Sequence, residues 1–297
     1  MNILVTGASG LVGSHFAEKA KDTFSLLTPK DTDFDITKKE AVERYFFNYK
    51  PQIVIHFAAH TDLDAAETQR DSVAGEAWQI NVEGTRHLAE AAQKLGSYFI
   101  HISTDHVFSG RADDPGPYSE DHPQETNPKR LSWYGWTKAQ AEKIIQSALA
   151  DFAIIRINNP CRASYSLKLD YARKILAAYD SGKKLRLFND QNLALTLIDD
   201  VSKVIEQLIK QPQNGIFHVA SSDLFTPYQL GEYLLKNARG AENAVTSSSI
   251  EDFYKKTGLI NRYAQYGGLR IEKTQQALGI QFKTWRGILD ILIKQGI

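Results

Sequence analysis

The chain contains almost no cysteine: Cys161 is the only one among 297 residues. One cysteine cannot form a disulfide within the chain, and this fits a reducing compartment. Long apolar runs are also missing, since none approaches the roughly 18 residues of a membrane-spanning helix. The first residues already have the pattern of a strand entering a glycine turn, which leaves no room for a signal peptide. We therefore expect a cytoplasmic protein.

An excess of charge of either sign is absent as well. Lysine and arginine together number 35, aspartate and glutamate also number 35, and the formal net charge is zero. Nucleic-acid binding and membrane-surface binding both favour a basic excess, so we expect neither kind of partner. The composition, with 42% hydrophobic and 24% charged residues, is that of an ordinary globular protein with a sizeable core.

Short apolar runs alternate with helical patterns along the first half of the chain. Several runs are entirely apolar, as in strands that are covered on both faces of a sheet. The predicted strands are Ile3–Thr6, Phe24–Leu27, Gln52–Phe57, Tyr98–Ser103 and Phe152–Ile157. The predicted helices between them are Leu11–Lys21, Lys38–Tyr49, Ala74–Leu95 and Tyr134–Ala150. This alternation predicts an α/β fold with a doubly wound parallel sheet.

The pattern changes beyond residue 158, where helices mix with two short strands, Leu185–Phe188 and Gly215–Val219. We predict a dinucleotide-binding Rossmann domain formed by residues 1–157 and 198–220. A smaller, largely C-terminal, substrate-binding domain is predicted for residues 158–197 and 221–297. Two long connections, Asp105–Trp133 and Asn158–Asp170, follow predicted strand ends. Open α/β sheets bind their ligands at such ends.

A glycine turn follows the first predicted strand. Gly7, Gly10 and Gly13 have the spacing G-x-x-G-x-x-G, a variant of the dinucleotide fingerprint. Gly7 permits the tight turn, Gly10 lets the backbone approach a pyrophosphate, and Gly13 allows a helix to pack closely on a strand. The helix that follows offers its N-terminus to phosphates. An ordinary glycine turn is the alternative, but the strand–turn–helix context favours a dinucleotide.

The end of the second predicted strand bears on which dinucleotide is bound. An acidic residue there would grip a ribose hydroxyl and favour NAD. The sequence has no acid at this tip, and Lys30 could pair with a 2′-phosphate. The pattern therefore favours NADP(H) over NAD(H), while a Lys30 that is simply solvated would leave both open.

Tyr134 and Lys138 stand four residues apart, on one face of a predicted helix. A nearby ammonium lowers the pKa of a phenol, so we expect Lys138 to turn Tyr134 into a proton donor for carbonyl reduction. The same spacing recurs at Tyr179 and Lys183, but Gly182 and its neighbours predict the end of a helix there. We therefore assign the chemistry to the first pair.

Hydroxyl and carboxyl side chains end the fourth predicted strand. Thr104 can hydrogen-bond a substrate oxygen, and Asp105 can accept from a sugar hydroxyl. Capping of the strand end is the alternative, and the two preceding motifs favour a functional role.

Together these residues resemble the extended short-chain dehydrogenase/reductase family, and within it the branch of the dTDP-4-dehydrorhamnose reductases. The resembling segments are Thr6–Gly13, Pro51–Thr61, Asp64–Glu67, Asn81–Thr85, Ser103–Phe108 and Tyr134–Lys138. The resemblance implies reduction of a 4-keto-6-deoxy nucleotide sugar, with Tyr134 protonating the oxygen. It implies a catalytic set of Thr104, Tyr134 and Lys138. It also implies that Thr104 and Asp105 meet the sugar.

The resemblance further implies a set of cofactor contacts. Gly10, Leu11 and Val12 would touch the pyrophosphate. Asp35 and Ile36 would lie at the adenine. Ala58, Ala59 and His60 would line the nicotinamide side, and Ser103 completes the set together with Tyr134 and Lys138.

The predicted substrate side departs from the family pattern. Asn159 stands where an aromatic residue is usual, the stretch after Gln191 lacks a glycine and a proline, and Arg262 is followed by tyrosine instead of proline. We assign Asn159, Gln191 and Arg262 to the substrate, and no residue to a metal. Other readings stay open: a different nucleotide-sugar reductase or epimerase, or a non-catalytic NADP-binding subunit like the regulatory subunit of methionine adenosyltransferase. The two longest predicted helices could pair in a homodimer or only cover the sheet.

Overall fold

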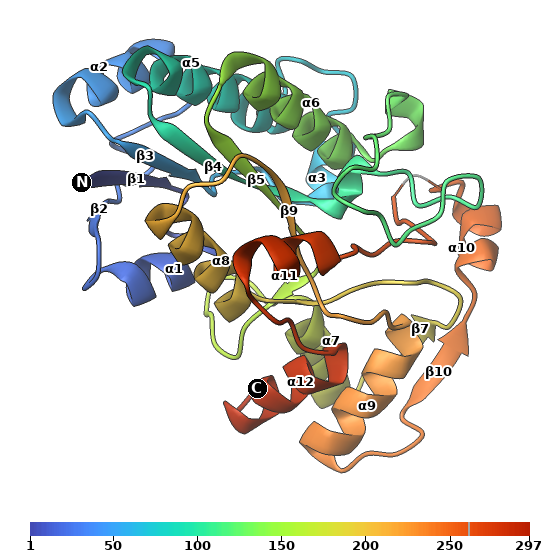
Figure 1. Ribbon diagram of the computed structural model, residues 1–297. Helices are drawn as coiled ribbons and strands as arrows, with labels where there is room; N and C mark the ends of the chain where they lie inside the picture. The colour runs from blue at the N-terminus through green and yellow to red at the C-terminus, as the bar shows by residue number, and fades with distance from the viewer. Residues whose placement is uncertain (261) are drawn as a thin grey trace. The chain divides into compact units, whose positions relative to one another are not determined.

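A six-stranded sheet forms the centre of the computed structural model, which describes residues 1–260 and 262–297. The strand order is β2-β1-β3-β4-β5-β9 (Figure 1). The strands are β1 (Asn2–Thr6), β2 (Ser25–Leu27), β3 (Ile53–His56), β4 (Tyr98–Thr104), β5 (Phe152–Ile157) and β9 (Gly215–Val219). β1 runs parallel to β2 and to β3, and β3 runs parallel to β4. The predicted doubly wound α/β fold is confirmed.

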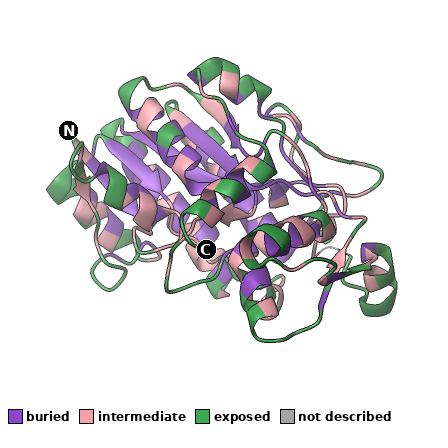
Figure 2. Cartoon of the chain, turned by 90° about the horizontal axis from the view of Figure 1, so that it is seen from below, coloured by how far each residue is buried: buried purple, intermediate pink, exposed green. Residues whose placement is uncertain are grey.

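Helices cover both faces of this sheet, which explains why its strands are nearly all apolar. The helices α2 (Lys39–Tyr49), α5 (Thr85–Leu95) and α6 (Trp133–Ala148) lie on one face. On the other face lie α1 (Gly13–Ala20) and α8 (Ile198–Lys210) (Figure 1). The central strands are buried, the edge strand β2 is partly exposed, and the outward faces of the helices are exposed (Figure 2). Within the described residues, no helix has both the length and the apolar character to cross a membrane.

The chain divides into two compact units. The first consists of Met1–Phe108, Pro123–Arg156 and Val201–Phe217, and it holds most of the sheet. The second consists of Ser109–His122, Ile157–Asp200 and His218–Ile297. The first unit is thus assembled from three separate stretches of sequence.

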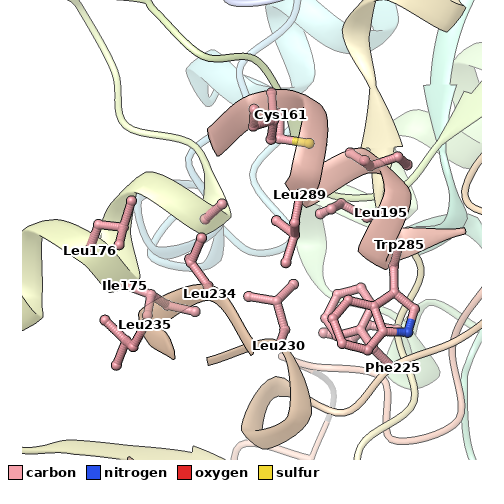
Figure 3. Close-up of a cluster of buried hydrophobic side chains, with 14 of the residues drawn as sticks. Cys161, Ile175, Leu176, Leu195, Phe225, Leu230, Leu234, Leu235, Trp285 and Leu289 are labelled. Atoms are coloured by element: carbon pink, nitrogen blue, oxygen red, sulfur yellow. The ribbon is translucent and has the colours of Figure 1, made fainter. Parts of the chain in front are cut away.

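The second unit has its own hydrophobic core, in which Leu230, Leu234 and Trp285 are almost completely buried (Figure 3). Cys161 belongs to this core, and its thiol donates to the Thr196 carbonyl at 3.3 Å. The helices are α7 (Tyr171–Asp180), α9 (Pro227–Arg239), α10 (Ile250–Thr257), α11 (Glu272–Leu278) and α12 (Trp285–Lys294). The strand pairs are β6 (Pro160–Cys161) with β8 (Thr196–Leu197), and β7 (Leu185–Phe188) with β10 (Val245–Ser248).

Several local predictions need correction or addition. The helix expected over Ala74–Leu95 is present from Glu76 to Leu95, but it is not uniform: α4 (Glu76–Trp78) leads into a π-helical turn, Gln79–Gly84, and then into α5. The short α3 (Leu63–Glu67) was not predicted, and two 3₁₀ turns, Asp105–Val107 and Pro128–Arg130, lie within the predicted connection Asp105–Trp133. The second Tyr–Lys pair does close a helix, because α7 ends at Asp180.

Candidate active site

The glycine turn after β1 is held between α1 and the residues that follow β3. Gly7 has φ +67°, and a Cβ there would lie 2.5 Å from the amide nitrogen of Ala58. A Cβ on Gly13 would lie 2.3 Å from the Gly7 carbonyl oxygen. Real Cβ atoms do not come so close, so glycine is required at both positions. Both glycines therefore act through packing, which keeps α1 close against the sheet.

Gly10 has a different environment. A Cβ there would meet only the Gly7 oxygen, at 3.3 Å, so the fold tolerates a side chain better at Gly10 than at its two partners. Val12 stands at the start of α1 and has no polar side chain to cap the helix, and Leu11 and Val12 are both partly exposed. A bare backbone leading into a helix N-terminus is suited to a pyrophosphate. The turn therefore fits a dinucleotide.

Alanine at these two glycines separates the two roles. We expect Gly10→Ala to keep the thermal stability of the wild type while it weakens NADPH binding about tenfold, or about 1.4 kcal/mol. We expect Gly13→Ala to lower stability by about 1–3 kcal/mol, because the new methyl group is overpacked against backbone. Calorimetry and fluorescence titration with NADPH measure the two effects. Equal losses of stability in both variants would contradict the assignment.

The predicted adenine side lies in the loops around β2 and α2. Lys30 is exposed just beyond β2. The Asp35 carboxylate is exposed and accepts from the Thr37 amide at 2.9 Å and from the Thr37 hydroxyl at 2.7 Å. Slight burial raises the pKa of Asp35, but these bonds and Lys38 hold it below its ordinary value. Ile36 is 7% exposed and packs in the core. Asp35 thus builds a turn, and its contact with an adenine stays a prediction.

The segment Ala58–His60 follows β3 directly and is half-buried. Asn81 of the π-helical turn fixes it, accepting from the His60 amide at 2.8 Å and donating to the His60 carbonyl at 3.1 Å. The Asn81 amide also donates to the Thr137 hydroxyl of α6 at 2.9 Å. Sequence reasoning gave Asn81 no role, although it lies in the π-helical turn and bonds to two other elements. The His60 Nδ1 atom is buried with no partner among the described residues, so it could serve a ligand.

Tyr134 and Thr104 are brought together because α6 begins against the turn that follows β4. Ser132 caps α6 by accepting from the Gly135 amide at 3.1 Å. A Cβ on Gly135 would lie 2.2 Å from the His106 carbonyl oxygen, so α6 packs closely on this turn. Thr104 is 6% exposed, and its hydroxyl lies close enough to the Tyr134 hydroxyl to lower the pKa of the phenol.

The expected effect of Lys138 on the phenol is wrong. Burial raises the pKa of Tyr134 above its ordinary value, the bond with Thr104 lowers it, and the carboxyl group of Asp105 raises it. Lys138 makes its bonds elsewhere, so it does not offset the burial of the phenol. Tyr134 is therefore a protonated phenol throughout the neutral range, which is the form that a proton donor needs.

Lys138 lies almost fully buried, with 2% of its surface exposed. Its Nζ donates to the carbonyl of Ile102 at 2.8 Å and lies 2.9 Å from Nε2 of His101. Burial lowers the pKa of Lys138 to about 7, although Glu142 acts to raise it. The side chain therefore changes charge near neutral pH.

Glu142 lies one further turn along α6, and its carboxylate accepts hydrogen bonds from three side chains. Arg156 of β5 donates to both of its carboxylate oxygens, at 2.7 Å for the shortest bond. Ser103 and Gln124 also donate to it. Ser103, which was predicted to contact the cofactor, is 2% exposed, and its hydroxyl donates to Glu142. Sequence reasoning missed Glu142, although its spacing from Tyr134 and Lys138 puts all three on one helix face.

Asp105 begins the 3₁₀ turn and is 8% exposed. Burial raises the pKa of its carboxyl group, against a lowering by the neighbouring His106. The His106 ring packs edge-on against the ring of Tyr134, with 5.6 Å between the ring centroids. The turn thus places one carboxyl group and one imidazole beside the tyrosine.

The other predicted substrate residues belong to the second unit. Asn159 has φ +43°, and its amide donates to the Ala194 carbonyl at 3.1 Å. Gln191 is 5% exposed and donates to the Ala264 carbonyl at 2.7 Å. Arg262 donates to the hydroxyl of Tyr263 at 3.0 Å. Each side chain has a partner within its unit, and their contact with a substrate stays a prediction.

This fold and this set of residues define a nicotinamide-dependent oxidoreductase of the extended short-chain dehydrogenase/reductase class. The sequence model of the family described as RmlD substrate binding domain matches residues 1–296, and the chain belongs to that family.

Curated relatives carry more than one kind of name. The spore coat polysaccharide biosynthesis protein SpsK of Bacillus subtilis is 28% identical, over 93% of this chain and 95% of the relative. The dTDP-4-dehydrorhamnose reductase of Escherichia coli is 29% identical, over 81% of this chain and 79% of the relative. Methionine adenosyltransferase 2 subunit beta of Rattus norvegicus is 28% identical, over 77% of this chain and 69% of the relative.

Solved structures show the same fold. The dTDP-4-dehydrorhamnose reductase from Bacillus anthracis, in complex with NADP, superposes with a TM-score of 0.85 at 23% identity, over 99% of both chains. A dTDP-4-dehydrorhamnose reductase from Clostridium acetobutylicum superposes with a TM-score of 0.84 at 25% identity, also over 99% of both chains.

Proposed function

We propose that the protein reduces a 4-keto-6-deoxy nucleotide sugar, with Tyr134 as the proton donor and NADPH as the preferred cofactor. The observation that carries this proposal is the Tyr134 hydroxyl beside that of Thr104, with the buried amino group of Lys138 one helical turn further on. Relatives named as dTDP-4-dehydrorhamnose reductases support the substrate class.

The chain's own groups divide the work of proton transfer. The cofactor, when bound, supplies the hydride. Tyr134 donates its phenolic proton to the oxygen of the substrate carbonyl, and Thr104 orients the phenol by its hydrogen bond. Lys138, whose amino group contacts His101 and the Ile102 carbonyl and not the phenol, is assigned to the cofactor side of the site. Gly10, Leu11 and Val12 would hold the pyrophosphate, and Asn81 fixes the backbone of His60 on the nicotinamide side.

The preference for NADP(H) rests on Lys30, which is exposed just beyond β2, and on the lack of an acidic residue at the tip of that strand, in Leu26–Lys30. The NADP bound to the Bacillus anthracis structure supports it, while the WbmG enzyme of Bordetella bronchiseptica, of similar fold, is in complex with NAD. We assign substrate binding to the domain of residues 158–197 and 221–297. A homodimer and a cytoplasmic location stay predictions.

The test is a spectrophotometric assay of NADPH and NADH oxidation with a panel of nucleotide sugars. We expect turnover with a dTDP-linked 4-keto-6-deoxy sugar, none with the matching sugar that has a C4 hydroxyl, and a higher kcat/KM with NADPH than with NADH. If the protein bound NADPH but oxidised it with none of the 4-keto nucleotide sugars, the proposal would be contradicted. That outcome would favour a non-catalytic role, as the likeness to the methionine adenosyltransferase subunit suggests.

A further inference from the structure

Three polar side chains form a buried layer across neighbouring strands of the sheet. The strand register aligns Thr6 of β1 with His56 of β3, and His56 with His101 of β4. All three are buried, and His101 has no exposed surface. The two imidazole rings lie 5.1 Å apart between their centroids. An imidazole inside an apolar sheet is unfavourable unless its nitrogens are hydrogen-bonded, so each of the two needs a reason to be there.

The fold accounts for His56. Its Nδ1 lies 2.7 Å from the Thr6 hydroxyl and its Nε2 lies 3.0 Å from the Thr85 hydroxyl of α5. The ring thus has a partner on each side and ties α5 to the sheet. Its hydrogen bonds do not include the amino group of Lys138.

The surroundings of His101 differ. Its Nε2 lies 2.9 Å from the amino group of Lys138. Its Nδ1 is buried with no hydrogen-bond partner among the described residues. The hydrogen bond of His101 is therefore to the lysine of the predicted catalytic set. The buried Nδ1 without a partner lowers the stability of the folded state. An apolar side chain would serve the packing of this sheet better.

The direction of the bond follows from the chemistry of the two groups. An ammonium has three N–H donors and no acceptor, so charged Lys138 donates and His101 Nε2 accepts. The ring proton of His101 is then on Nδ1. Burial and the nearby charge of Lys138 hold the pKa of His101 well below its ordinary value, so the imidazole stays neutral and keeps its acceptor.

The charge of Lys138 depends on few groups. Burial lowers its pKa to about 7, and Glu142 on its own helix raises it. From β4 it faces His101 and the carbonyl of Ile102, and from β3 it acts electrostatically on His56. A neutral acceptor favours the charged form of its donor, so loss of this acceptor changes the charged fraction at neutral pH.

We propose that His101 is a positioning residue of the active site, whose neutral imidazole fixes the amino group of Lys138 and favours its ammonium form. The effect on turnover rests on the proposed function, whereas the effect on the lysine itself does not. The two can therefore be tested separately.

The experiment compares two variants of nearly equal shape, His101→Gln and His101→Met. Glutamine can keep an acceptor near the position of Nε2, and methionine replaces it with a weakly accepting thioether. His56→Met is the matched control, because it removes the aligned imidazole of the next strand. The first measurement is the pH titration of Lys138 in protein labelled with ¹³C-lysine, assigned with Lys138→Arg. The second is the dependence of kcat on pH.

We expect His101→Met to lower the titration midpoint of Lys138 by about one pH unit. The charged fraction at pH 7 then falls about fivefold, and kcat falls with it. In His101→Gln, both the titration midpoint of Lys138 and kcat should stay closer to the wild-type values. His56→Met should leave the midpoint near that of the wild type. An unchanged midpoint in His101→Met, or an equal shift in His56→Met, would overturn the proposal. If the proteins turn over no 4-keto sugar, the function proposed above fails, and the titration still decides the role of His101.

Discussion

We expect that replacing Tyr134 with phenylalanine strongly slows the proposed carbonyl reduction and leaves the fold intact. The expected fall in kcat is about 10²–10⁴-fold, the usual contribution of a positioned proton donor. The ring of Tyr134 packs against the buried cluster of Ala66, Ala77 and Trp133, and phenylalanine keeps that packing. Only the hydroxyl and its bond with Thr104 are lost. Steady-state assays measure kcat, and fluorescence titration should show NADPH binding close to that of the wild type.

The chain supplies a matched control for this variant. Tyr179 has the same spacing to a lysine, Lys183, but it lies at the end of α7 and packs against the core of the second unit. Tyr179→Phe should therefore keep wild-type kcat. Full activity in Tyr134→Phe would rule out Tyr134 as the donor, and equal losses in both variants would show that the loss has a cause other than proton transfer.

Breaking the buried ion pair of Glu142 and Arg156 should be the most damaging change to stability. The Glu142 side chain has no exposed surface and that of Arg156 has 1%. Replacing Arg156 with methionine leaves a buried carboxylate without its main partner, and the expected loss is about 3–5 kcal/mol in the free energy of unfolding. Ser103 and Gln124 would still donate to Glu142, but neither carries a charge. Denaturant titration measures the loss.

A second variant distinguishes an unpaired charge from lost packing. Adding Glu142→Leu to Arg156→Met removes both charges, and such replacements by apolar residues are often close to neutral. The double variant should therefore recover much of the stability. Lys39→Met is the surface control, because Lys39 pairs with Glu90 at 2.9 Å with both side chains exposed, and it should unfold near the wild-type midpoint. Further loss of stability in the double variant would contradict this account of the pair.

The parts of the fold that could be predicted from the sequence are those set by local pattern. A strand buried on both faces favours an apolar run, and β3 and β5 have one in Ile53–Ile55 and Phe152–Ile155, each followed by a buried polar residue. The glycine turn is readable because steric contacts at Gly7 and Gly13 leave no alternative residue. The helix α10 was missed although a signal existed: Ser249 caps it by accepting from the Asp252 amide, and a serine three residues before an acid is a known helix start.

The parts that could not be predicted depend on distant partners. Asn81, in the π-helical turn Gln79–Gly84, bonds to His60 and Thr137, and no periodicity within the turn reveals these partners. The raised pKa of Tyr134 is an effect of burial, which spacing alone does not give. The sequence likewise shows His101 only as one residue of a predicted strand. Its partner Lys138 lies on another element, so the contact could not be predicted.

The edge strand β9 has a consequence for the growing polypeptide. It takes its place beside β5 in the sheet, yet it comes from residues 215–219 (Figure 1). While the ribosome is still making the intervening stretch, the backbone amide and carbonyl groups along one side of β5 have no strand to bind. Open edges of this kind are templates for aggregation. A fragment that stops at residue 157 would carry the glycine turn, Tyr134 and Lys138, and would still lack the strand that closes its sheet.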